Sequence, residues 1–202
     1  MRFDARFYDR YYRDPATRVA SRDDALRLGR FICAYTSYLG FRVRRVLDAG
    51  CGLGHMRKPV REFFPHARYV GLEASGYLCR RHGWVRASIA DYAPRTPFDL
   101  VICHDVLQYL PDREAVPALG NLARLCRGAL YFSVLTAEDW RRNADRARTD
   151  SGMRLRPVGW YRSRLARNFR PLGGGLLVRR GSAPLLWELE RPWPRRPRSA
   201  PN

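Results

Sequence analysis

One short segment, from Val46 to Gly54, restricts the fold of this chain more than any other. It begins as an apolar stretch typical of a buried strand, passes through Asp48, and ends with glycines at alternate positions, Gly50, Gly52 and Gly54. Glycine permits positive φ in a tight turn and lets a ligand approach the backbone. A strand that enters such a turn and then a helix predicts an α/β fold with a crevice at the carboxyl end of its first strand.

The spacing of these glycines and the charge beside them indicate the kind of ligand. A dinucleotide fingerprint has the spacing G-x-G-x-x-G, with phosphates on the helix N-terminus. Here the third glycine comes one residue earlier, and His55 follows it. Asp48 would repel a pyrophosphate, but its carboxylate can bind a cationic ligand. The alternative interpretation is a tight strand-to-helix turn that binds nothing.

Four further segments follow in the order expected of successive strands and the loops after them. The first is a short apolar stretch that ends in Glu73, and the second leads to Asp91 and Tyr92. The third carries His104 directly after a run of apolar residues. Because each segment ends where a ligand-binding loop is expected to start, the set favours a ligand site over a bare turn. The four segments are residues 67–73, 85–92, 98–112 and 128–135.

From about Arg45 to Thr136 the chain resembles the class I S-adenosylmethionine-dependent methyltransferases, of the small-molecule type. In that family the glycine loop surrounds the methionine part of the cofactor, and the chain matches it at Asp48 and all three glycines. The resemblance implies a doubly wound, Rossmann-like α/β sheet of about seven strands. It further implies a mostly parallel sheet with an antiparallel edge strand, and helices on both faces.

The resemblance also implies S-adenosylmethionine as the cofactor and assigns the residues that hold it. Glu73 falls where the family places the carboxylate that binds both ribose hydroxyls, since two acceptor oxygens suit two vicinal donors. Asp91 falls where an acidic side chain accepts from the adenine amino group. The implied cofactor-binding residues are Asp48, Gly50, Cys51, Gly52, Glu73, Ala74, Asp91, Tyr92 and His104.

His104 is also the candidate catalytic residue. Displacement at a sulfonium methyl needs alignment above all, and a base only if the acceptor must lose a proton. Imidazole titrates near neutral pH and suits that role, although His104 could equally fix its loop or contact the cofactor. Many small-molecule enzymes of this type carry a Glu-His pair where Gln108 and Tyr109 stand here, so a base from that pair is in doubt.

Residues 1–40 are predicted to form an N-terminal helical lid segment. Tyr8, Tyr11 and Tyr12 share a face at helical spacing, and either cover the cofactor or simply pack on the domain edge. Ser21 or Asp23 is expected to cap a helix that ends near residues 39–40. The substrate pocket is predicted to include Tyr8, Tyr11 and Tyr109.

The rest of the chain predicts one domain over residues 1–190 and a basic, flexible Pro/Arg-rich tail over residues 191–202. Gly173 to Gly175 is expected to form a turn before the final strands. The predicted helices cover residues 55–64, 75–82, 114–125, 140–148 and 157–169, and the final antiparallel strands cover 176–178 and 185–190.

Composition limits location and partners. Five cysteines without zinc-type spacing predict a reducing cytoplasm and no metal site. The sequence holds no apolar run of membrane-spanning length and no expected signal peptide. A small-molecule acceptor is preferred because no added nucleic-acid module is visible. The net charge of +19 leaves an RNA or other nucleic-acid methyltransferase open, and a non-catalytic cofactor-binding scaffold is the third interpretation. The oligomeric state is undetermined.

Overall fold

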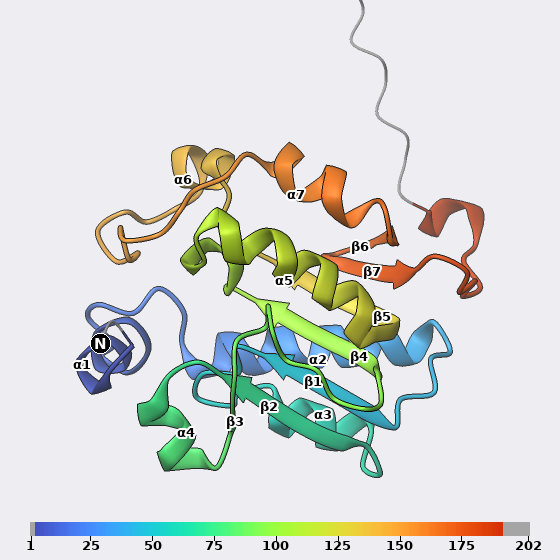
Figure 1. The fold of residues 1–202 in the computed structure, drawn as a ribbon, viewed down its shortest axis with the longest axis horizontal. Helices are drawn as coiled ribbons and strands as arrows, with labels where there is room; N and C mark the ends of the chain where they lie inside the picture. Colours follow the sequence, from blue (N-terminus) through green and yellow to red (C-terminus); the bar gives the residue numbers. More distant parts are fainter. Residues whose placement is uncertain (1–2, 192–202) are drawn as a thin grey trace, which may run out of the picture.

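The computed structural model describes residues 3–191 and has a seven-stranded sheet at its centre, in the order β3-β2-β1-β4-β5-β7-β6 (Figure 1). The first five strands are parallel, whereas β7 runs antiparallel to both β5 and β6. This confirms the predicted fold class. The strands are β1 (Arg45–Ala49), β2 (Arg68–Glu73), β3 (Val85–Arg86), β4 (Phe98–His104), β5 (Cys126–Ser133), β6 (Phe169–Gly173) and β7 (Leu176–Arg179).

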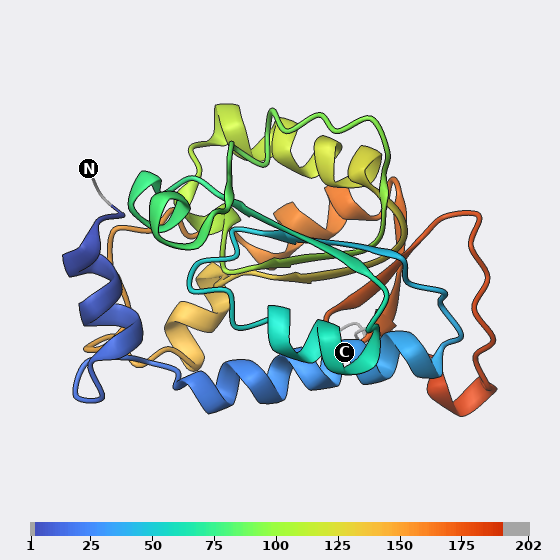
Figure 2. The same ribbon diagram turned by 90° about the horizontal axis from the view of Figure 1, so that it is seen from below.

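The central strands are apolar throughout because both faces of the sheet are covered. Successive side chains of a strand point to opposite faces. In β4, Leu100 and Ile102 therefore pack into one core, and Val101 and Cys103 pack into the other. Helices α2 (Arg22–Tyr38) and α3 (Arg57–Phe63) cover the first face, whereas α5 (Asp112–Leu125) and α7 (Val158–Leu165) cover the second (Figure 2).

Local signals set most helix boundaries where the sequence predicted them. Ser21 accepts a hydrogen bond from the Asp24 N–H, and the Asp24 carboxylate accepts from the Ser21 N–H, so this capping box starts α2. α3 starts at Arg57, later than residue 55, with Pro59 in its first turn, where a missing N–H costs no hydrogen bond. α4 (Gly76–His82) ends at Gly83 in the left-handed conformation.

The C-terminal third differs from the prediction at three places. Helix α6 (Ala137–Arg142) begins earlier than residue 140, because Thr136 and Asp139 form a second capping box, and it also ends earlier than residue 148. The helix predicted over residues 157–169 stops at Leu165 as α7, and Phe169 begins β6 instead. β6 and β7 are joined by the predicted turn through Gly173–Gly175, so the final antiparallel pair lies earlier in the chain than predicted.

The strand predicted over residues 185–190 is wrong. A short 3₁₀ helix, η3 (Glu188–Glu190), lies there, and Trp187 and Leu189 are exposed. β6 occupies the sheet edge instead, where Pro171 is tolerated because an edge strand need not donate on both sides. The predicted basic tail, apart from Arg191, lies outside the described residues. In residues 3–191 no helix is long and apolar enough to cross a membrane.

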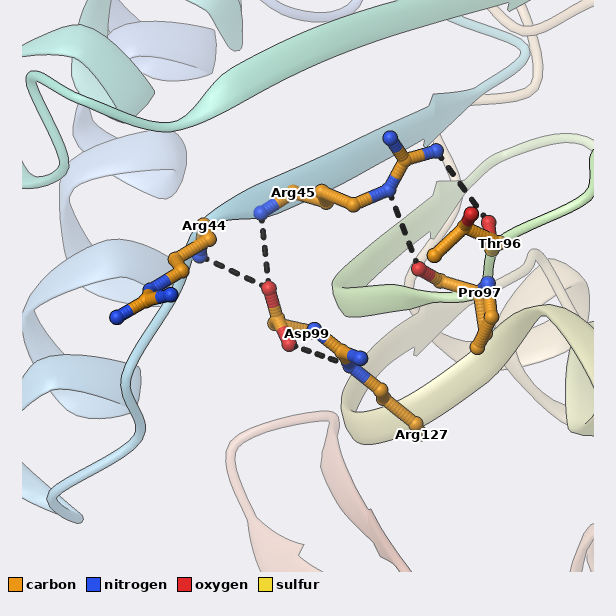
Figure 3. Close-up of polar contacts among 6 residues, drawn as sticks. All are labelled: Arg44, Arg45, Thr96, Pro97, Asp99 and Arg127. Atoms are coloured by element: carbon orange, nitrogen blue, oxygen red, sulfur yellow. Dashed lines mark hydrogen bonds and ion pairs between the residues drawn. The ribbon is translucent and has the colours of Figure 1, made fainter.

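A buried carboxylate ties the amino ends of three strands together (Figure 3). Asp99 Oδ2 accepts from the backbone N–H groups of Arg44 and Arg45, both at 2.8 Å, and Oδ1 accepts from Arg127 Nε at 2.7 Å. Burial alone would raise the pKa of Asp99, but these donors hold it below its usual value. This network fixes β1, β4 and β5 at the end of the sheet opposite the glycine turn.

Candidate cofactor and acceptor site

The candidate site lies at the carboxyl ends of the parallel strands. The strand order reverses between β1 and β4, and the loops that leave these two strands diverge and open a crevice. The same ends of β1, β2 and β4 point toward α1 (Ala5–Tyr8), at the left of Figure 1. Two adjoining hollows occupy this crevice, and both are lined by Gly50, Gly52, Asp105 and Tyr109.

The glycine turn is hydrogen-bonded to β2 at Gly50 and Cys51, whereas at Gly52 it faces the two hollows. The N–H groups of Gly50 and Cys51 donate to the Leu72 carbonyl at 2.7 and 3.0 Å, which holds the turn against β2. Gly50 has φ of +73°, and a Cβ there would lie 2.3 Å from Val106 Cγ2. A Cβ on Gly52, at φ of +50°, would instead meet open space. The backbone at Gly52 is therefore accessible to a ligand in either hollow.

Glu73, at the tip of β2, supports this turn and lines the smaller hollow. The carboxylate is buried, with Oε2 accepting from the Gly52 N–H and Oε1 accepting from the Ser75 N–H, both at 2.9 Å. Each carboxylate oxygen has a second lone pair, so both can still accept from a ligand. Glu73 can therefore hold the turn and bind a vicinal diol at the same time.

Asp48, on β1, lines the larger hollow and is only 3% exposed. Burial, together with the nearby charge of Glu73, raises the pKa of Asp48 to about 7, although the Tyr69 hydroxyl donates to Oδ2 at 2.5 Å and opposes the rise. Such a group is half-protonated near neutral pH when no cation lies beside it. A cationic ligand would favour the ionised form, so binding and proton release are coupled.

The smaller hollow has apolar walls and the Glu73 carboxylate at one end. Its volume of about 100 Å³ is below the ~300 Å³ of ordinary ligand pockets. Phe3, Phe7, Tyr8 and Tyr12 from the N-terminal segment form one wall. Most of this wall belongs to α1 and the π-helical turn η1 (Asp9–Arg13).

Aromatic contacts hold the N-terminal segment over the site. The Ser75 hydroxyl donates to the Phe3 carbonyl at 2.6 Å, and the Phe3 ring packs edge-on against Tyr109 with centroids 5.3 Å apart. Tyr8 is buried in the smaller hollow, where burial and then the charge of Glu73 raise its pKa. Of the three predicted pocket tyrosines, Tyr8 lines the smaller hollow, Tyr11 lines the larger hollow, and Tyr109 lines both.

The larger hollow, of about 590 Å³, contains the candidate catalytic residue. His104 ends β4, and its Nε2 lies 3.3 Å from Asp105 Oδ2. Asp105 has φ of +55°, the single positive value at a non-glycine residue within 3–191, and its N–H donates to the Ser133 carbonyl at 2.9 Å. Gln108 Nε2 donates to Asp105 Oδ1 at 3.1 Å. A strained residue held by three neighbours at a strand tip is typical of a functional site.

Asp91 and Tyr92 are not among the residues that line either hollow. β3 ends at Arg86, and the Asp91 and Tyr92 N–H groups donate to the Ser88 carbonyl in the following turn. That turn leaves the Asp91 side chain exposed and packs Tyr92 against the core beside α5. Ser88 and Ile89 line the smaller hollow in their place. The predicted role of Asp91 toward an adenine amino group gains no support from this placement.

The other predicted residues gather at the crevice. Ala74 lines the smaller hollow, and Cys51 and His104 line the larger one. Sequence reasoning missed the acidic segment after α6, where Asp145 and Asp150 join Asp139 in the wall of the larger hollow. These acids recur every five or six residues, which no helical face explains, and this spacing was the available signal.

Comparison with known proteins agrees with this geometry. The sequence profile of the family described as "Methyltransferase domain" matches residues 7–171, well over half of the chain. The chain belongs to the class I S-adenosylmethionine-dependent methyltransferases. This confirms the resemblance seen in the glycine loop and strand tips, and S-adenosylmethionine is the cofactor of that family.

Relatives and solved structures place this methyltransferase domain among diverse proteins. It is 35% identical over 78 residues to a trans-aconitate 2-methyltransferase of Azoarcus sp. (strain BH72), a match that covers 35% of this chain and 31% of that one. The N-methyltransferase NodS of Bradyrhizobium japonicum WM9, solved with S-adenosyl-L-homocysteine, has a TM-score of 0.54 at 17% identity, covering 76% of this chain and 88% of NodS. Streptomyces venezuelae DesVI has a TM-score of 0.57 at 16% identity, and the match covers 77% of this chain and 91% of DesVI.

Proposed function

We propose that this protein transfers a methyl group from S-adenosylmethionine to a small molecule. The observation that carries the proposal is the pair of buried strand-tip carboxylates, Asp48 and Glu73, on either side of a glycine turn with accessible backbone. The cofactor is a cation with a vicinal diol. Its ammonium group suits Asp48, and its diol suits Glu73, so the residues present fit the group.

When bound, the cofactor supplies a methyl group on a positively charged sulfur that leaves as a neutral thioether. The protein's own contribution is positioning. The glycine turn and Glu73 orient one partner, and the wall formed by Phe7 and Tyr8 excludes water from it. Alignment of this kind can supply ~7–11 kcal/mol of the barrier. His104 is the group placed to accept a proton if the acceptor has one to lose.

A small acceptor is supported by the dimensions and charge of the larger hollow. Its volume of about 590 Å³ suits a compact metabolite. The net charge of +19 would favour a nucleic-acid acceptor, but the aspartates that line this hollow would repel a phosphate backbone. The match to the named relative covers 31% of its length, so its acceptor is not transferred to this chain.

We also infer a reducing compartment, the cytoplasm. All five cysteines are free and buried within the sheet, its helices and the glycine turn. Burial raises the pKa of the Cys33 and Cys126 thiols to about 12, which keeps them uncharged and unreactive.

The test is calorimetric titration with S-adenosyl-L-homocysteine. We expect binding to the wild-type protein, and a loss of about tenfold or more in Glu73→Ala, because the diol acceptor and the anchor of Gly52 disappear together. Asp23→Asn is the matched control, since Asp23 is exposed and outside the described linings of both hollows. No binding at millimolar ligand to folded wild-type protein would contradict the proposal.

A further inference from the structure

We propose that the methyl acceptor is a small protonated amine bound in the larger hollow. This assignment rests on the proposed function and names its substrate class. The hollow that holds His104 shares Tyr12, Gly50, Gly52, Asp105 and Tyr109 with the smaller hollow, but most of its other walls are separate. These come from α2, the β4 and β5 tips, and the segment after α6.

The charge of this hollow is opposite to that of the chain. Among residues 3–191, six aspartates and a single arginine line it, in a protein of net charge +19. That arginine, Arg148, already faces Asp145, with Nε 3.7 Å from Oδ2. A carboxylate or phosphate acceptor would find no uncompensated cation among the described lining residues, whereas an ammonium group would find acceptors on several sides. The aspartates are Asp24, Asp105, Asp139, Asp145 and Asp150, together with Asp48, which is assigned to the cofactor ammonium and leaves the other five for the acceptor.

A second observation points to a hydrogen-bond donor in the same place. Gln108 lines the hollow, is 2% exposed, and uses its Nε2 to donate to Asp105. Its Oε1 is buried and has no hydrogen-bond partner within the described part of the chain. A buried acceptor without a partner costs about 1–3 kcal/mol. An ammonium or amine N–H would satisfy it, whereas a carboxylate has no proton to offer.

The remaining walls suit the body of an organic amine. Tyr11, Tyr12 and Tyr109 present aromatic faces or edges, and Leu28 and Val134 add apolar surface. Aromatic rings attract cations through their π faces, and apolar walls favour a hydrocarbon stem. The hollow therefore combines an acidic lining with a partly aromatic one, which is the pattern expected for an amphipathic cation.

The amine must lose a proton before it can attack. His104 is placed to accept that proton, and the Asp105 carboxylate, 3.3 Å from Nε2, stabilises the resulting imidazolium. The lone pair of the neutral nitrogen then forms a bond to the methyl carbon. The carbon–sulfur bond breaks, its electron pair remains on sulfur, and the positive charge moves to the methylated nitrogen. The product leaves as the methylated ammonium cation, and His104 then gives the proton that it accepted to water.

Probes matched in shape and different in charge test the assignment. Protein saturated with S-adenosyl-L-homocysteine is titrated with phenethylamine, 3-phenylpropionate and 2-phenylethanol in a calorimeter. We expect phenethylamine to bind about tenfold or more tightly than the carboxylate, with the alcohol between them. Similar affinities for the amine and the carboxylate, including no binding of either, would overturn the amine assignment.

Variants locate the site and separate its failure from that of the proposed function. Asp105→Asn and Asp145→Asn should each weaken phenethylamine binding by about fivefold. S-adenosyl-L-homocysteine affinity should stay within about twofold in Asp145→Asn, because Asp145 lines the larger hollow and is not among the residues of the smaller one. Asp23→Asn should change neither affinity. Unchanged amine binding in both cavity variants would overturn the site. S-adenosyl-L-homocysteine binding without amine preference would overturn only the acceptor class, whereas no S-adenosyl-L-homocysteine binding would overturn the proposed function itself.

Discussion

The two ends of the parallel sheet each bury an aspartate, and the two differ in the hydrogen-bond donors around them. At the amino end, Asp99 is 8% exposed and accepts from three donors on β1 and β5 and the residue before β1. At the carboxyl end, Asp48 is 3% exposed and accepts from the Tyr69 hydroxyl. Burial raises the pKa of both carboxyls, but the donors around Asp99 outweigh it and lower that pKa, whereas the pKa of Asp48 rises to about 7.

This difference separates a structural carboxylate from one that serves a ligand. Asp99 has its donors supplied by the fold and contributes to stability. Burial of the ionised Asp48 carboxylate costs free energy that the Tyr69 hydrogen bond only partly offsets. A cationic ligand beside Asp48 can stabilise the ionised carboxylate further. Buried groups with raised pKa values in a crevice are typical of functional sites.

The largest effect on stability should follow from removing the Asp99 carboxylate at the amino end of the sheet. Asp99→Ala leaves two backbone N–H groups and the Arg127 guanidinium without their acceptor, so we expect the free energy of unfolding to fall by roughly 3 kcal/mol. Chemical denaturation measures this loss. A loss below about 0.5 kcal/mol, the range of ordinary surface substitutions, would mean that the network does not hold the strands together.

The opposite result is expected at the ligand end. Asp48→Asn keeps an oxygen that can accept from Tyr69 but removes the buried charge. The free energy of unfolding at pH 8 should therefore be up to about 3 kcal/mol higher than that of the wild type. S-adenosyl-L-homocysteine affinity should fall about tenfold or more. Thermal denaturation and calorimetry on one preparation measure both. A variant that binds normally, or that is less stable than wild type at pH 8, contradicts the comparison.

The same comparison predicts opposite pH dependence at the two ends. Because the folded-state pKa of Asp48 is raised to about 7, its contribution destabilises the protein as pH rises from ~4 toward 7. Because the pKa of Asp99 is lowered, its stabilisation is present above the unfolded value and is lost as pH falls below ~4. Denaturation curves of wild type, Asp48→Asn and an Asp99 variant between pH 3 and 8 should separate these two slopes. Slopes unchanged by either substitution would refute the assignment.

The smallest effect concerns the donor of Asp48. Tyr69→Phe removes the hydroxyl that opposes the rise of the Asp48 pKa, so the pH midpoint of S-adenosyl-L-homocysteine binding should move upward by about one unit. Calorimetric titrations at several pH values measure the midpoint. Affinity at pH 9 should be nearly unchanged, which distinguishes this electrostatic effect from a loss of folding. A midpoint that stays in place would show that Tyr69 does not influence Asp48.

The features that sequence reasoning predicted well are those set by local chemistry. The glycine turn, Glu73 at the β2 tip and the Ser21 cap each depend on a few adjacent residues. Asp91 lies outside the linings of both hollows, and its position depends on where β3 stops pairing with β2, a pairing that is only two residues long. The strand over residues 176–178 was predicted correctly and is β7, but its partner was misplaced, because β6 is selected by its long-range fit beside β7 and not by its own sequence, which contains Pro171.

The acidic wall was missed for a related reason. Residues 140–148 looked like an exposed arginine-rich helix, but the Thr136–Asp139 capping box starts the helix earlier. The helix ends at Arg142, and Asp145 and Asp150 lie in the irregular segment that follows. Only tertiary placement brings that segment beside His104. The recurrence of these acids was visible in the sequence, but their position in the wall of the hollow was not.

The most direct test of the central claim counts protons when S-adenosyl-L-homocysteine binds. Calorimetry at pH 6.5, in buffers of different ionisation enthalpy, reports the number exchanged. With the Asp48 pKa at about 7, binding of the ligand ammonium beside Asp48 should release more than about half a proton in wild type and almost none in Asp48→Asn. Binding without proton release in the wild-type protein would contradict the account.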